Sequence, residues 1–177
     1  MLMRKTFLGT YKGLRVNSCP TRELAVYPPI LDRIYNQLLS LQSYYSRIMI
    51  IRIDLHFPEN HDIDHKLENT LIIRYLKLLK SDLGSSRWQS HKRFIHGWVK
   101  ENGKTQRSHH HLFIGIQSLQ RVLGLISDAG HTSLWGLLEN RWKALSGGSV
   151  QLCGYHVVER ENPSSLDGCL YHLSYLA

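Results

Sequence analysis

The feature that most constrains the fold is a pair of apolar, strand-like segments joined by a polar connection. Residues 93–101 (RFIHGWVKE) and 109–116 (HHHLFIGI) flank the sequence NGKTQRS, which begins with Asn102-Gly103. An Asn-Gly pair between two such segments is a strong signal for a β-hairpin, because its residues tolerate the positive φ angles of a tight turn. The sequence therefore predicts an antiparallel pair of strands near the middle of the chain.

The rest of the chain mixes helical and strand patterns. Apolar residues recur with a helical period in residues 30–45, at Ile30, Ile34 and Leu38. Residues 47–57 (RIMIIRIDLHF) are rich in β-branched side chains and predict a central strand. Further helices are predicted at 67–83, 118–130, 132–145 and 165–177, and a further strand at 149–159. This order predicts an α+β fold, with a central antiparallel sheet of about five strands and helices packed mainly on one face.

The length and the cysteines bound the class of protein. A chain of 177 residues suits one domain, and Pro28-Pro29 separates an N-terminal arm, residues 1–29, from a domain of residues 30–177. No apolar run approaches the ~20 residues of a membrane span, and the N-terminus lacks the apolar segment of a signal peptide. The three cysteines are widely spaced. They favour a reducing cytoplasm over a disulfide framework or a CxxC zinc motif.

The charge of the chain favours a polyanionic partner. Twenty-two Lys and Arg residues against 14 Asp and Glu residues give a formal net charge of +8. A compact basic domain most simply binds nucleic acid, although a merely basic surface would give the same composition.

Three consecutive histidines begin the second strand of the hairpin. Alternation along a strand places His109 and His111 on one face, roughly 7 Å apart, and His110 on the other. Glu101 approaches the same place from the partner strand. Two imidazoles and a carboxylate form a three-ligand metal site with open positions, as a catalytic metal requires. The alternative readings are an exposed polar strand end and a surface that contacts phosphate.

Two further side chains compete with Glu101 for the third position. Asp54 and His56 alternate on one face of the predicted strand 47–57, which is a neighbour of the hairpin in the simplest sheet. They are predicted either to support the metal ligands from behind or to replace Glu101 as a ligand.

Two tyrosines lie near the end of the last predicted helix. Tyr171 and Tyr175 are four residues apart, which places them on one helix face with Cβ atoms roughly 5–6 Å apart. Such pairs usually pack in the core or at its rim, so by themselves they only weakly suggest a catalytic role.

Taken in order, these residues resemble the HUH endonucleases, and most closely the replication initiators of inovirus-type phages and of plasmids. The metal motif of that family is two histidines flanking one residue before an apolar strand, which is matched by His109 and His111. Its nucleophile motif is tyrosine, two residues, then lysine, often with a second tyrosine four residues earlier. Tyr171 and Tyr175 have this spacing, and the lysine would fall after Ala177. The residue between the two histidines, usually apolar, is His110 here.

The resemblance implies a fold and a reaction. The fold would be ferredoxin-like or RRM-like, and His109, His111 and Glu101 would hold Mg²⁺ or Mn²⁺. Tyr175, with Tyr171 as a second nucleophile or helper, would nick and join single-stranded DNA through a 5′-phosphotyrosine intermediate. Such an enzyme starts rolling-circle replication of a phage or plasmid at an origin or hairpin, in the cytoplasm of a bacterial, archaeal or phage-infected host, without contact with a membrane.

Basic side chains near the motif strands are predicted to hold the DNA backbone. These are Arg52, Lys92, Arg93, Lys100, Lys104 and Arg107. Two other functions remain open from the sequence: a non-catalytic nucleic-acid-binding domain of similar fold, and a metal-dependent hydrolase that uses water as its nucleophile.

Overall fold

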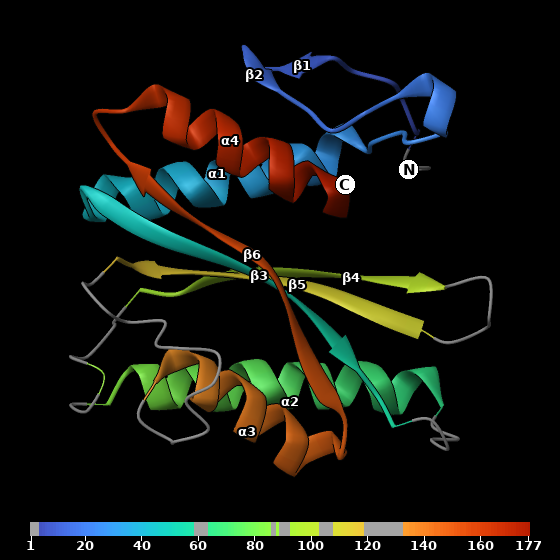
Figure 1. The fold of residues 1–177 in the computed structure, drawn as a ribbon, viewed down its shortest axis with the longest axis vertical. Coiled ribbons are helices and arrows are strands. Elements are labelled where there is room, and N and C mark those ends of the chain that lie inside the picture. Colours follow the sequence, from blue (N-terminus) through green and yellow to red (C-terminus); the bar gives the residue numbers. More distant parts are fainter. Residues whose placement is uncertain (1–3, 59–63, 86–87, 89–92, 103–107, 119–132) are drawn as a thin grey trace.

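The computed structural model of the protein describes residues 4–58, 64–85, 88, 93–102, 108–118 and 133–177 (Figure 1). Within these residues, four strands form the main sheet: β3 (Arg47–His56), β4 (Ile95–Asn102), β5 (Ser108–Gln117) and β6 (Ser149–Glu159). Their order across the sheet is β4-β5-β3-β6, and every neighbouring pair is antiparallel. The predicted α+β class is therefore confirmed.

The order of elements along the chain explains this arrangement of strands. Helix α2 (His65–Leu83) connects β3 to β4, and helix α3 (Leu134–Ser146) precedes β6. A β-α-β-β-α-β succession with this strand order is the ferredoxin-like topology. The helix predicted at residues 118–130 falls almost entirely on residues 119–132, which lie outside the described residues.

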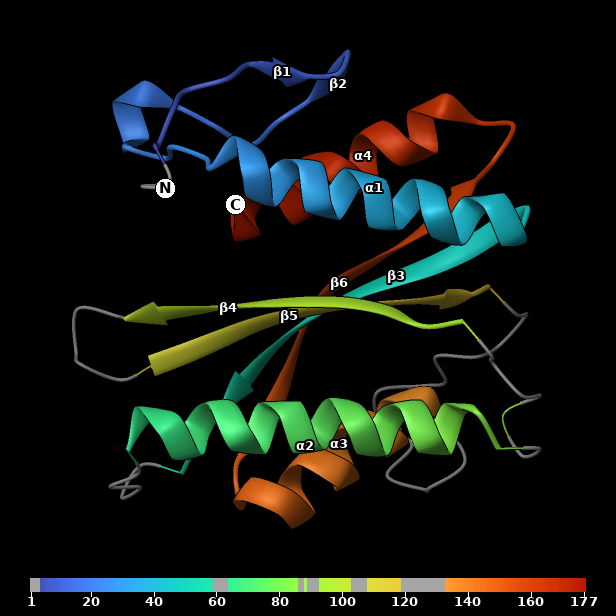
Figure 2. The same ribbon diagram turned by 180° about the vertical axis from the view of Figure 1, so that it is seen from behind.

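The helices cover both faces of the sheet, so the prediction of a sheet covered mainly on one face was wrong. The crossover helices α2 and α3 cover one face, and α1 (Pro28–Tyr44) and α4 (Pro163–Leu173) cover the other (Figures 1 and 2). The cause lies in β3, which is apolar on both faces. Ile51 and Ile53 are buried in the core beneath α2 and α3, whereas Ile48 and Ile50 are buried beneath α1 and α4. A strand that is hydrophobic without alternation needs cover on both faces.

The predicted number of strands also needs correction. The main sheet has four strands rather than about five in the part of the chain that the structure describes. Two very short strands, β1 (Thr10–Tyr11) and β2 (Leu14–Arg15), pair with each other as a separate ribbon.

The apolar cover on the α1/α4 side ends halfway along β3, and this leaves room for a polar site. On that face Ile48 and Ile50 are followed by Arg52, Asp54 and His56, all of which are partly exposed. The opposite face stays apolar as far as Leu55. On the face covered by α1 and α4, one half of β3 therefore contributes to the hydrophobic core and the other half presents polar side chains.

The N-terminal arm packs on the end of the chain rather than extending away from it. The 3₁₀ turn η1 (Pro20–Arg22) follows the ribbon, and the backbone N–H of Tyr27 donates to the carbonyl oxygen of Ala177 over 2.7 Å. The backbone N–H of Asn17 donates to Ser174 Oγ over 2.8 Å. These bonds fix the 3₁₀ turn η3 (Ser174–Leu176), which continues α4.

Asp167 binds the arm and does not cap a helix. It follows Ser164 by three residues, the spacing of a capping box at a helix N-terminus. Helix α4 begins at Pro163 after Asn162, without a side-chain cap. Asp167 instead accepts hydrogen bonds from the backbone and guanidinium of Arg15, each over 2.7 Å. No helix among the described residues is long and apolar enough to cross a membrane.

Candidate active site on the histidine strand

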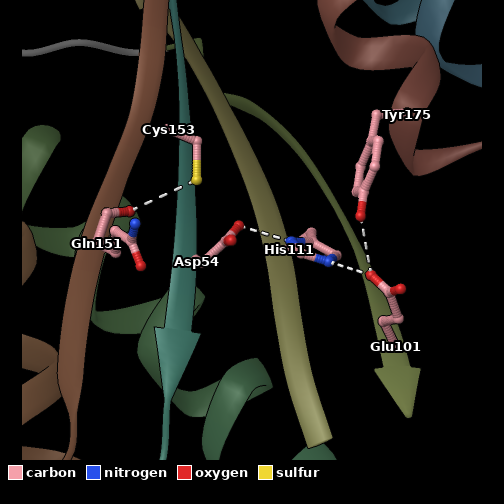
Figure 3. A network of polar contacts seen from close by, with 6 residues as sticks. All are labelled: Asp54, Glu101, His111, Gln151, Cys153 and Tyr175. Atoms are coloured by element: carbon pink, nitrogen blue, oxygen red, sulfur yellow. Dashed lines mark hydrogen bonds and ion pairs between the residues drawn. The ribbon is translucent and has the colours of Figure 1, made fainter. Parts of the chain in front are cut away.

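His111 lies between two carboxylates from the neighbouring strands. It is directly opposite Asp54 of β3, and His111 Nδ1 is 2.6 Å from Asp54 Oδ1. On the other side, His111 Nε2 is 2.7 Å from Oε2 of Glu101 on β4 (Figure 3). The side chains of His111 and Asp54 are 8% and 17% exposed, whereas that of Glu101 is 52% exposed, so only the contact with Asp54 is largely shielded from water. Side chains from three adjacent strands thus meet at the His111 imidazole.

The two carboxylates control the protonation of His111. Burial by itself lowers the pKa of the imidazole, but hydrogen bonds to Asp54 and Glu101 outweigh burial and raise it. Burial likewise raises the pKa of Asp54, whereas the bond to His111 and the nearby positive charges lower it overall. The arrangement favours an imidazolium between two carboxylates when no metal is bound.

Tyr175 reaches this group from the end of the chain. Its hydroxyl donates to Glu101 Oε2 over 3.1 Å (Figure 3). Its ring meets the His111 ring edge-on, with centroids 5.2 Å apart. The guanidinium carbon of Arg52 lies 4.3 Å from the centroid of the Tyr175 ring. The structure therefore brings together three residues from separate parts of the chain: Glu101 of β4, His111 of β5 and Tyr175 near the C-terminal end.

His111 and Glu101 are residue types that can hold a divalent ion. A metal-bound histidine commonly donates its second ring N–H to a carboxylate, which fixes the tautomer. Asp54 stands in this position at Nδ1, and the Nε2 lone pair of neutral His111 would face the Glu101 carboxylate. No group of three or more metal-binding side chains occurs among the described residues. The side chain of His109 lies outside them, although its backbone pairs with Glu101.

The other predicted residues near the metal motif lie as follows. His56 is two residues after Asp54 and pairs with Ser149 of the edge strand β6. His110 lies on the α2 face, fully buried, with its ring centroid 5.7 Å from that of Phe57. Its Nε2 is 3.9 Å from a carboxylate oxygen of Glu68. His110 is therefore part of the opposite layer of the protein.

The predicted DNA-binding residues are dispersed. Lys100 forms an ion pair with Glu68 on the α2 face, with 2.6 Å between Nζ and Oε2, and both side chains are largely buried. Arg93 precedes β4, at the opposite end of that strand from Glu101, with its guanidinium 3.2 Å from the ring centroid of Tyr44. Arg52 contacts Tyr175. The remaining three, Lys92, Lys104 and Arg107, lie outside the described residues.

Tyr171 does not share the environment of Tyr175. It is 44% exposed, and the Arg15 guanidinium of the arm lies 5.7 Å from its ring centroid. Helix α4 ends at Leu173, and residues 174–176 form a 3₁₀ turn. The two tyrosines therefore have different neighbours: Arg15 at Tyr171, and Glu101 and Arg52 at Tyr175.

A second histidine pair at this site was missed by sequence reasoning. His156 Nε2 of β6 is 3.0 Å from His172 Nδ1 of α4. The signal in the sequence was Gly154, because a glycine inside a strand often marks a bulge or a close approach. A register shift occurs between Arg52 and Ile53, and Gly154 has a φ of +142°. A Cβ at Gly154 would lie 3.0 Å from His172 Cε1.

Comparison with known proteins identifies the family. The model of the YagK/YfjJ C-terminal domain matches residues 11–177, which include the main sheet, the flanking helices and Tyr175. Neither the curated proteins nor the solved structures gave a match. The chain belongs to the YagK/YfjJ C-terminal domain family.

Proposed function

We propose that this protein nicks and joins single-stranded DNA by transesterification, with Tyr175 as the nucleophile and a Mg²⁺ or Mn²⁺ ion at His111, Glu101 and His109. One observation carries the proposal: the Tyr175 hydroxyl is 3.1 Å from the carboxylate that also contacts His111. A nucleophile held beside a candidate metal centre is the arrangement that phosphoryl transfer requires. The ferredoxin-like topology and the basic charge agree with this function.

In this reaction the Tyr175 oxygen attacks phosphorus and the bond to the 3′ oxygen breaks. The downstream strand becomes linked through its 5′ phosphate, and the upstream strand leaves with a 3′-OH after taking up a proton. Attack of that 3′-OH on the phosphotyrosine rejoins a strand. A bound divalent ion would act as a Lewis acid on the phosphate. Initiation of rolling-circle replication of a phage or plasmid, in the cytoplasm of its host, is the use that we propose for this chemistry.

The residues of the chain would divide the other tasks among them. Glu101 accepts the hydrogen bond of the Tyr175 hydroxyl and so orients it toward the site. Asp54 holds Nδ1 of His111 and fixes the ring. Burial and then the Glu101 charge raise the pKa of Tyr175, so the hydroxyl is protonated in the resting state. A cation shared by Glu101 and His111 would offset that charge and favour attack.

A denaturing gel tests the proposal. The full chain is mixed with a 3′-labelled single-stranded origin or hairpin DNA and Mn²⁺, and covalent transfer of label to protein is measured. Tyr175→Phe should abolish the adduct, because it removes only the attacking oxygen. Tyr155→Phe is the matched control. Tyr155 is 55% exposed, and its strand partner Ile51 belongs to the core beneath α2 and α3, on the face of the sheet away from Tyr175.

The gel also separates the two alternatives. Free ends without labelled protein would indicate a hydrolase that uses water. An intact strand that is only retarded on a native gel would indicate a non-catalytic nucleic-acid-binding domain. An adduct that persists in Tyr175→Phe would refute the assignment of the nucleophile.

A further inference from the structure

On the β6 side of Tyr175, the sheet face carries a second group of nitrogen-bearing side chains. Arg52 of β3 pairs with Gly154 of β6 in the register, and His172 of α4 lies directly above that glycine. His156, two residues further along β6, contacts His172. In the strand order, β6 lies on one side of β3, and β5 and β4, which carry His111 and Glu101, lie on the other. Tyr175 contacts Glu101 on β4 and Arg52 on β3.

Arg52 has hydrogen-bonding capacity that the described residues leave unused. A guanidinium has five N–H donors and no acceptor. Within the described part of the chain, the Arg52 side chain makes no hydrogen bond and no ion pair, and its Nε is buried without a hydrogen-bond partner. The carboxylate of Asp54, two residues further along the same strand, is engaged with His111. A buried donor without a partner needs an explanation, and an anion that binds in function is one.

The histidine pair adds one donor beside this guanidinium. In the contact between His156 Nε2 and His172 Nδ1 one ring donates and the other accepts, so a neutral pair keeps a single free N–H, on His172 Nε2 or on His156 Nδ1 according to which ring donates. Burial, the positive charge of Arg52 and the neighbouring His156 together lower the pKa of His172 to about 4, against the opposing effect of Asp54. Burial lowers the pKa of His156 as well. Both rings are thus neutral at pH 7, in surroundings that disfavour a further positive charge.

We propose that Arg52, His156 and His172 form an anion site that takes a phosphodiester group of the DNA strand on the β6 side of Tyr175. The guanidinium matches the geometry of phosphate oxygens, and a neutral imidazole donates one N–H to an anion. Gly154 contributes by keeping the space below His172 free of a side chain. The identification of the anion as a strand phosphate rests on the proposed function, whereas the anion chemistry of the site does not.

The two sites together define a path for the DNA strand across the sheet. The phosphate that Tyr175 attacks would lie beside a divalent ion held by Glu101 and His111, and a flanking phosphate would lie at Arg52 and His172. The strand would then cross the sheet from β4 toward β6, beneath the 3₁₀ turn that carries Tyr175.

Imidazole ¹⁵N NMR of the full-length Tyr175→Phe chain tests this site without any covalent step. The protein is titrated separately with inorganic phosphate and with a single-stranded oligothymidylate. Binding of either should shift the His156 and His172 signals and raise the pKa of His172 by about one unit or more, because a nearby anion stabilises the imidazolium. The distant His96 on β4 serves as the reference signal.

Two substitutions and one control locate the binding. Arg52→Gln and His172→Gln should each weaken the affinity for the oligothymidylate by about tenfold, as expected for a lost charge-assisted bond. Arg52→Lys should recover part of the loss. Arg47→Gln removes an exposed arginine from the start of the same strand and should change the affinity little. The ¹⁵N–¹H spectrum of each variant reports whether it is folded.

Each result decides the proposal. Shifts with the oligothymidylate, with or without shifts from free phosphate, support a strand-phosphate site. Shifts with inorganic phosphate alone would overturn the assignment to DNA, and the absence of shifts with both would overturn the site. Binding without any adduct from the native chain would refute the proposed nicking and leave the anion site standing, whereas an adduct without these shifts would do the reverse.

Discussion

The close contact between Gly154 and His172 gives a stability prediction that can be worked from the structure. At a φ of +142°, a residue with a Cβ is strained, and backbone strain of this kind costs about 1–3 kcal/mol. The new Cβ would also lie 3.0 Å from His172 Cε1, so the imidazole must move by a few tenths of an ångström. Gly154→Ala should therefore lower the free energy of unfolding by about 1–3 kcal/mol. For a chain of this size the melting temperature should fall by roughly 2–12 °C.

Gly168→Ala is the matched control in the same chain. Gly168 lies inside α4, and a Cβ there would meet nothing within 4 Å. Alanine is favoured over glycine in a helix interior by roughly 0.5–1 kcal/mol, so this variant should be more stable than the native chain. Urea denaturation followed by circular dichroism measures both effects. A Gly154→Ala protein as stable as the native chain would refute the close contact and the backbone conformation at β6.

Three further outcomes are expected. Because the pKa of His172 is lowered to about 4 in the folded state, against 6.5 for the free side chain, the unfolded state binds more protons between these values. The urea midpoint should therefore fall as the pH is lowered from 6.5 toward 4, and it should fall less in His172→Gln; an equal fall in both proteins would contradict the assignment. Asp54→Asn should lower the pKa of His111, measured by NMR, and weaken Mn²⁺ binding about 10–100-fold in calorimetry, while His111→Ala should abolish binding. Tyr171→Phe should leave the first formation of the adduct within about twofold of the native rate, because Tyr171 faces Arg15 and not Glu101; a loss as large as that of Tyr175→Phe would show that both tyrosines act in the first cleavage.

The hairpin and the placement of its side chains were predictable because they depend on local patterns. Alternation and an Asn-Gly turn predicted two strands at 93–101 and 109–116, and the structure has them at Ile95–Asn102 and Ser108–Gln117. Strand periodicity also predicted that His110 would lie opposite to His111, as it does. The proximity of Glu101 to His111 follows from the same register.

Other features of the site depend on contacts between distant parts of the chain. Spacing alone predicted that Tyr171 and Tyr175 share one helix face, but the structure gives them different neighbours. Tyr175 lies in a 3₁₀ turn beside Glu101, whereas Tyr171 lies beside Arg15 of the arm. Lys100 was predicted to hold the DNA backbone, but its Nζ forms an ion pair with Glu68 of α2 on the opposite face of the sheet. No local pattern specifies which helix covers which face.

The sequence by itself determined the α+β class, the hairpin and the set of side chains along each strand, because these follow from periods of two and 3.6 residues. The tertiary structure decided that Asp54 lies behind His111 rather than beside Glu101, that Arg52 stacks on Tyr175, and that His156 meets His172. The physical reason is that β3 is apolar on both faces for half its length and needs helices on both. Where the apolar contacts with α1 and α4 end, the polar half of β3 lies beneath His172 and Tyr175, and only the packing of the whole domain brings these segments together.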